Sequence, residues 1–154
     1  MPKSFQQKLK ILYLMRVFAE KTDEAHPMSV KDLIAYLENF GIHAERKTIY
    51  DDIETLRVFG MDIMNRRERP SGFYLASREF EVAELKLLVD AVQSSRFLTT
   101  GKSRQLIQKL ESLTSIYQAK DLQRQVIVQN RVKNTNENIY YNIDEIHRAI
   151  SQNR

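Results

Sequence analysis

The feature that most constrains the fold of this chain is a change of hydrophobic period at Gly60. Before this glycine, apolar residues recur at the spacing that marks one face of a helix. After it, they alternate with polar residues, which is typical of a half-buried strand. A helix that ends at a glycine and leads directly into strands predicts a small unit in which the helix packs beside a hairpin.

Three helices are predicted up to that boundary. The first spans residues 5–20, and its apolar side chains form two adjacent stripes, so we expect burial on more than one side. Ser29 is placed to cap the second helix, which ends at Gly41. The third spans about residues 46–59. Three helices followed by a hairpin within residues 1–78 predict a winged helix-turn-helix domain.

The remainder of the chain is predicted to be mainly helical. Residues 79–117 are interpreted as a helical hairpin, broken at Thr99-Thr100-Gly101, that offers a dimerisation region. Residues 118–154 are interpreted as a polar linker and a C-terminal helix. An alternating island in the linker predicts a short strand; it consists of Val126, Val128 and Val132. The expected fold class is therefore mainly α with a small β-hairpin, a winged helix-turn-helix followed by a helical region.

The predicted last helix, about residues 139–151, carries a regular isoleucine stripe. Its members are Ile139, Ile143, Ile146 and Ile150. Full burial of each would contribute roughly 1.5–3 kcal/mol, so the stripe is expected to have a partner surface. We expect it to fold back on the helices of residues 81–117 or, by preference, to bury against a second subunit.

Composition narrows the class of protein. The 154 residues are 42% hydrophobic and 29% charged, as in globular chains. They include no cysteine, which excludes disulfides, thiolate metal sites and cysteine nucleophiles. No signal-like segment and no apolar run of the roughly 18 residues of a membrane helix are present, so we expect a cytoplasmic protein without a membrane partner. A net charge of +4 favours an anionic partner.

Two basic elements favour double-stranded DNA as that partner. The exposed face and first turn of the third helix carry Arg46, Lys47, Thr48, Tyr50 and Arg57. The tip of the hairpin adds Arg66, Arg67 and Arg69. Arg and Lys reach guanine edges and phosphates, and hydroxyl groups reach phosphate oxygens. A solvated amphipathic face would explain the helix alone, but a second basic element on a projecting turn is typical of a protein that straddles a groove.

The acidic residues and the histidines give little support to other chemistry. Asp51, Asp52 and Glu54 share the third helix and would repel phosphate unless they pair with nearby cations. The three histidines are scattered, and Gly101-Lys102-Ser103 matches only the end of a phosphate-binding loop. We therefore expect no enzyme, no catalytic residue, no metal and no cofactor.

The sequence of the third helix and the hairpin resembles a known family. ERKTIYDDIETL over residues 45–56 and FGMDI over residues 59–63 closely resemble the bacterial WYL-domain transcriptional regulators with a DeoR-like winged helix. GFYL over residues 72–75 is similar to the family's return strand, and residues 79–117 are similar to its following helical region. The resemblance implies a sequence-specific DNA-binding regulator that acts as a homodimer on two half-sites.

One departure from that family bears on regulation. The sequence contains no tryptophan, so the Trp-Tyr-Leu motif of the sensing domain is missing, and the chain ends where that domain would begin. We expect an N-terminal portion or a naturally short form, in which a small-molecule or nucleic-acid effector would act only through the absent C-terminal domain. The alternative function is a winged-helix protein-interaction module without DNA binding.

Overall fold

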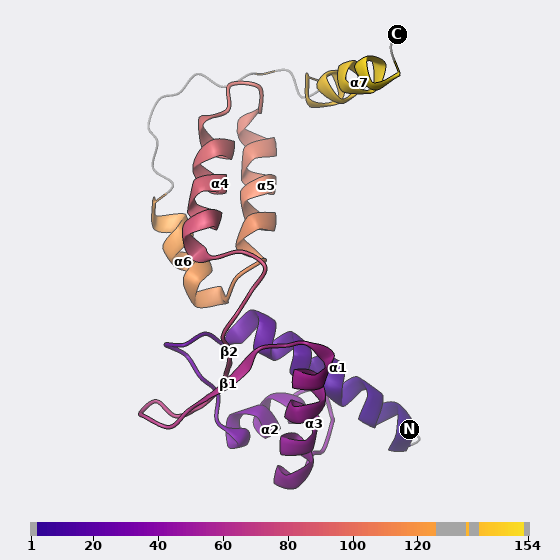
Figure 1. Ribbon diagram of the computed structural model, residues 1–154, viewed down its shortest axis with the longest axis vertical. Coiled ribbons are helices and arrows are strands. Elements are labelled where there is room, and N and C mark those ends of the chain that lie inside the picture. Colours follow the sequence, from indigo (N-terminus) through magenta and orange to yellow (C-terminus); the bar gives the residue numbers. More distant parts are fainter. Residues whose placement is uncertain (1–2, 126–134, 136–138, 153–154) are drawn as a thin grey trace. The chain divides into compact units, whose positions relative to one another are not determined.

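A computed structural model of the chain describes residues 3–125, 135 and 139–152 (Figure 1). The protein is mainly helical with one small antiparallel sheet, which confirms the predicted fold class of a winged helix followed by a helical region. The described residues form two compact units. Unit 1 comprises the residues up to Glu79 together with Thr114–Tyr117, and unit 2 comprises Phe80–Leu113 and the residues from Gln118 onward.

Unit 1 begins with the three helices that the apolar spacing predicts. They are α1 (Lys3–Lys21), α2 (Val30–Glu38) and α3 (Arg46–Phe59). Ser29 caps α2 in a reciprocal capping box: its hydroxyl accepts from the Asp32 amide at 3.2 Å, and the Asp32 carboxylate accepts from the Ser29 amide at 3.1 Å. Gly60 ends α3 with a left-handed φ of 111°, a conformation that glycine adopts without steric cost.

The core of unit 1 lies where these helices meet. Ile49, Ile53 and Leu56 on α3 are 0%, 1% and 3% exposed, which confirms the predicted buried face of this helix. On α1, Leu14 and Phe18 are fully buried, while Leu12 on the same helix remains exposed. The wide apolar surface of α1 is therefore largely used inside the unit, and only part of it remains for another partner.

The hairpin consists of β1 (Ile63–Arg66) and β2 (Gly72–Leu75), paired antiparallel with Ile63 opposite Leu75. Phe73 of β2 also exchanges two backbone hydrogen bonds with Met28, at 2.8 and 2.9 Å. Met28, which precedes the cap of α2, thus pairs with β2 as an isolated antiparallel bridge. Gly72 makes this approach feasible, since a Cβ added there would lie 2.4 Å from the Met28 carbonyl carbon and oxygen. The hairpin is thus fixed to the start of α2.

Unit 2 is helical in its described residues. Its elements are α4 (Val82–Ser94), α5 (Thr100–Glu111), most of α6 (Ile116–Gln125) and α7 (Ile139–Ser151). The first two lie side by side and run in opposite directions (Figure 1). Leu85 and Val89 on α4 and Ile107 on α5 are buried. Thr99 caps α5 by accepting from the Lys102 amide at 3.2 Å.

The structure differs from the sequence interpretation after α5. The predicted second helix of the hairpin continues to Tyr117, whereas α5 ends at Glu111 and α6 begins at Ile116. Helix α6 then covers residues that were expected to be linker. Leu122, 1% exposed, supplies the burial that stabilises this otherwise polar helix. The strand predicted at Val126, Val128 and Val132 lies outside the described residues.

The isoleucine stripe of α7 is largely uncovered. Ile146 and Ile150 are 58% and 66% exposed, and Ile143 is half-buried. Ile139 is not among the residues whose burial the structure describes. Ion pairs from Arg148 to Asp144 and Glu145, at 3.2 and 3.4 Å, occupy another part of the helix surface. What covers the stripe, the helices of residues 81–117 or a second subunit, therefore stays a prediction.

Candidate nucleic-acid interface

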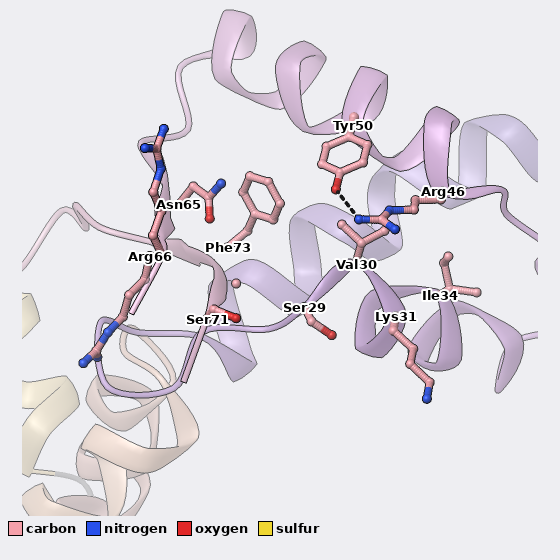
Figure 2. A pocket seen from close by; sticks show the side chains of 12 residues that line it. Ser29, Val30, Lys31, Ile34, Arg46, Tyr50, Asn65, Arg66, Ser71 and Phe73 are labelled. Atoms are coloured by element: carbon pink, nitrogen blue, oxygen red, sulfur yellow. Dashed lines mark hydrogen bonds between the residues drawn. The ribbon is translucent and has the colours of Figure 1, made fainter. Parts of the chain in front are cut away.

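A cavity of about 510 Å³ lies in unit 1, lined by the start of α2, the start of α3 and the hairpin (Figure 2). Four cationic side chains from these three segments contribute to its lining: Lys31, Arg46, Arg66 and Arg67. Its other polar and aromatic residues include Ser29, Ser71, Asn65, Tyr50 and Phe73. The helix and the hairpin, predicted separately as basic elements, thus contribute to one surface.

Arg46 and Tyr50 of α3 are in direct contact at this cavity. Arg46 Nη2 donates to the Tyr50 hydroxyl at 3.3 Å, and the guanidinium carbon lies 5.9 Å from the centroid of the Tyr50 ring (Figure 2). On its other side, the Tyr50 ring meets the ring of Phe73 edge to face, with centroids 6.0 Å apart. Arg46 and Tyr50 of α3 and Phe73 of the hairpin therefore form a continuous series of contacts.

The other two predicted residues at the start of α3 differ in their surroundings. Lys47 is exposed and does not line the cavity. The Thr48 hydroxyl donates to the Glu45 carbonyl at 2.8 Å, which stabilises the first turn where Glu45 itself makes no side-chain cap. Thr48 therefore has a structural role, and only its oxygen lone pairs remain for a ligand.

Arg57 is positioned apart from this group. Its Nε donates to the Ile63 carbonyl at 2.8 Å, its Nη1 forms an ion pair with Glu54, and its guanidinium lies 5.9 Å from the centroid of the Phe73 ring. These contacts connect the last turn of α3 to β1. Arg57 does not line the cavity to which Arg46, Arg66 and Arg67 contribute.

The three hairpin arginines also differ in their contacts and in whether they line the cavity. Arg66 Nη1 donates to the Glu24 carbonyl at 2.8 Å, so this side chain fastens the hairpin to the loop between α1 and α2. Arg67 is exposed and lines the cavity. Arg69 is exposed at the tip and lies outside the cavity lining.

Two of the three acidic residues on α3 are paired with cations. Asp52 binds Lys10 of α1 at 2.6 Å, and the two side chains are only 18% and 11% exposed. Glu54 binds Arg57. Asp51 is exposed. Pairing reduces the repulsion that these carboxylates would exert on a phosphate backbone. Sequence reasoning missed Lys10, although a lysine within the apolar part of α1 was a signal for a buried partner.

Lys31 is a second residue of the site that is not among the predicted DNA-contacting residues. It lies in the first turn of α2, two residues after the Ser29 cap, and lines the cavity with the arginines of α3 and the hairpin. The available signal was the capping box of Ser29 and Asp32, which encloses Lys31 in the sequence. A capped helix start fixes where the side chains of its first turn project.

A buried carboxylate organises the loop after α1. Asp23 Oδ1 accepts from the Ala25 and His26 amides at 3.0 and 2.9 Å and lies 2.7 Å from His26 Nδ1, while Oδ2 accepts from the Ser115 hydroxyl. Burial of Asp23 disfavours its charge, but the hydrogen bonds from Ser115 and His26 outweigh that effect and hold the pKa of the carboxyl below its ordinary value. His26 also stacks on Tyr117, with centroids 3.7 Å apart. This cluster fixes the loop that accepts Arg66.

Within residues 3–125, 135 and 139–152, no group of three or more histidine, aspartate or glutamate side chains is arranged to hold a metal ion. No helix in the described part of the chain is both long and apolar enough to cross a membrane. Comparison with known proteins found no family model, no curated protein and no solved structure that matches this chain.

Proposed function

We propose that this chain is a sequence-specific DNA-binding transcriptional regulator that uses α3 as its recognition helix and the hairpin as a basic wing. The observation that carries the proposal is that four cationic residues from three separate segments line one cavity: Lys31, Arg46, Arg66 and Arg67. A duplex presents phosphates on both sides of each groove, and cations on two projecting elements match that pattern.

The proposal gives the site residues different roles. Arg46 and Lys47 at the start of α3 meet base edges and phosphates in the major groove. Thr48 and Tyr50 offer oxygen atoms beside them. Arg66, Arg67 and Arg69 meet phosphates beside the groove or enter the minor groove. Arg57, engaged by Ile63 and Glu54, holds the wing against α3 and contributes indirectly.

The resemblance to the WYL-domain regulators supports this proposal and adds to it a cytoplasmic location and action as a homodimer. Ligand sensing would then require a C-terminal domain of the kind those regulators carry. The exposed isoleucines of α7 support a second subunit as the partner of that helix, because an uncovered apolar stripe favours association.

A protein-interaction module is the second candidate, and one observation favours it. Val58 and Phe59 at the end of α3 and Met64 on β1 are 89%, 75% and 50% exposed. Large apolar side chains that remain exposed can serve as a protein contact. None of the three residues lines the cationic cavity, so both functions are compatible with the same fold.

DNA binding is tested by fluorescence anisotropy with a random-sequence duplex and with the upstream DNA of the protein's own gene. We expect affinity to fall steeply as salt rises, by about 10³–10⁵-fold between 50 and 200 mM if 6–10 phosphates are contacted, because neutralised phosphates release counterions. Arg46→Ala and Lys47→Ala should each weaken binding by about 1–3 kcal/mol.

Arg104→Ala supplies the matched control, since Arg104 is an exposed arginine on α5 in unit 2. It should leave both the affinity and its salt dependence nearly unchanged. Absence of binding at low ionic strength, or an equal loss in the Arg104 variant, would contradict the proposal and leave the interaction module as the better reading.

The dimer is tested by light scattering at micromolar concentration. Replacing Ile143 and Ile146 together by Asp should convert a dimer to monomers, because two charges would enter the apolar stripe of α7. Asn142→Asp adds a charge at an exposed position of the same helix outside the stripe and should leave the dimer intact. A parent chain that is monomeric with and without DNA would eliminate this part of the proposal.

A further inference from the structure

Tyr50 lies on α3, the proposed recognition helix, and its ring contacts the hairpin, the proposed wing. Its hydroxyl accepts from Arg46, and its ring abuts Phe73 of β2 (Figure 2). We infer that Tyr50 is a specificity-determining positioning residue, which holds the Arg46 guanidinium in the orientation that reads a guanine edge. This inference rests on the proposed DNA-binding function and assigns the base recognition within it.

The need for such a residue follows from the chemistry of arginine. A guanidinium reads guanine through two parallel hydrogen bonds to O6 and N7, which requires its plane to be oriented. Arg46 is exposed on the first turn of α3, where a long side chain samples many rotamers. The hydrogen bond to Tyr50, one helical turn further on, removes part of that freedom before DNA is met.

The tyrosine is itself held by a rigid element. Phe73 is 7% exposed, and its backbone is hydrogen-bonded to Met28 at 2.8 and 2.9 Å. Its ring also lies within reach of the Arg57 guanidinium, which is bonded to the Ile63 carbonyl. Because the Phe73 ring is anchored in the hairpin, its contact fixes the position of the Tyr50 ring. The Tyr50 hydroxyl in turn fixes the Arg46 guanidinium. The reading of sequence by α3 therefore depends on the wing being in place.

The competing role for Tyr50 is a direct phosphate contact. Its hydroxyl accepts from Arg46 and retains its own proton, which a phosphate oxygen would accept. The two roles predict different results. A phosphate contact contributes equally to all sequences, whereas an oriented arginine contributes only at the base that it reads.

The test is Tyr50→Phe in the full chain, with Tyr74→Phe as the matched control. The first substitution removes the acceptor and keeps the ring beside Phe73, and the second removes a hydroxyl from β2 at a position that does not line the cavity. Each protein is used to select duplexes from a randomised library. Affinities are then measured for the parent's preferred duplex, for its single guanine-to-adenine variants and for random-sequence duplex.

We expect Tyr50→Phe to lose about tenfold of the discrimination at one guanine position while its affinity for random duplex changes less than twofold. Its melting temperature and the behaviour of Tyr74→Phe should match the parent. A uniform loss across all duplexes would overturn the inference in favour of a phosphate contact, and unchanged discrimination would overturn it outright. If the parent binds no duplex, the proposed function fails first, and the role of Tyr50 fails with it.

Discussion

Replacing Gly72 by alanine is expected to destabilise the protein by about 2–4 kcal/mol and to abolish the proposed DNA binding. The added Cβ would lie 2.4 Å from two backbone atoms of Met28 and 2.8 Å from the Ser29 nitrogen. Backbone atoms cannot move aside as the end of a flexible side chain does. The strand would have to separate from Met28, with loss of both hydrogen bonds to Phe73.

Gly41→Ala provides the control for backbone conformation. Gly41 also has a positive φ, 69°, but nothing lies within 4 Å of the position of its Cβ. Its substitution should cost only about 1 kcal/mol, the cost of a left-handed conformation. Guanidinium unfolding of the two variants measures the difference, and similar midpoints would show that the close approach of β2 to Met28 is not what Gly72 provides.

Lys10→Met is expected to destabilise the protein by about 2–4 kcal/mol, because it leaves the Asp52 carboxylate without its counter-ion. The ammonium and the carboxylate are 2.6 Å apart and largely shielded from water between α1 and α3. Removal of one member of such a pair costs more than the pair itself contributes, since the remaining charge is poorly solvated.

Two further variants test that reasoning by urea unfolding. Lys8→Met removes an exposed lysine from the same helix and should change the free energy of unfolding by less than about 0.5 kcal/mol. Combining Lys10→Met with Asp52→Leu removes both charges and should recover much of the lost stability. A double variant as unstable as Lys10→Met alone would show that packing of the lysine stem, rather than charge pairing, is responsible.

Helix α3 was predictable because its local signals agree. Ile49, Ile53 and Leu56 repeat at helical spacing and face the core, and Gly60 supplies the left-handed residue that ends α3. The hairpin was equally predictable, since alternation of apolar and polar residues and a turn rich in Pro, Ser and Gly are both local sequence signals. Patterns of this kind depend on residues within a few positions of one another.

The parts that were not predictable depend on distant or unlike partners. Helix α6 has mainly polar residues and is stabilised by the burial of Leu122, which periodicity does not reveal. In the candidate site, the grouping of Arg46 with Arg66 and Arg67 was inferred from fold order, but the turning of Arg57 toward the Ile63 carbonyl was not. A basic residue on an exposed face has many partners within reach, and sequence does not select among them.

The hydrogen bond from Ser115 to Asp23 joins residues that are 92 positions apart, and both belong to unit 1. This unit is therefore discontinuous along the chain, and residues 80–113 form an insertion within it. During synthesis, the loop after α1 cannot acquire its last contacts until Tyr117 has left the ribosome, by which time the whole of α4 and α5 has emerged. Closing so long a loop carries an entropic cost that grows only slowly with its length. The order of translation thus delays completion of the domain that was begun first.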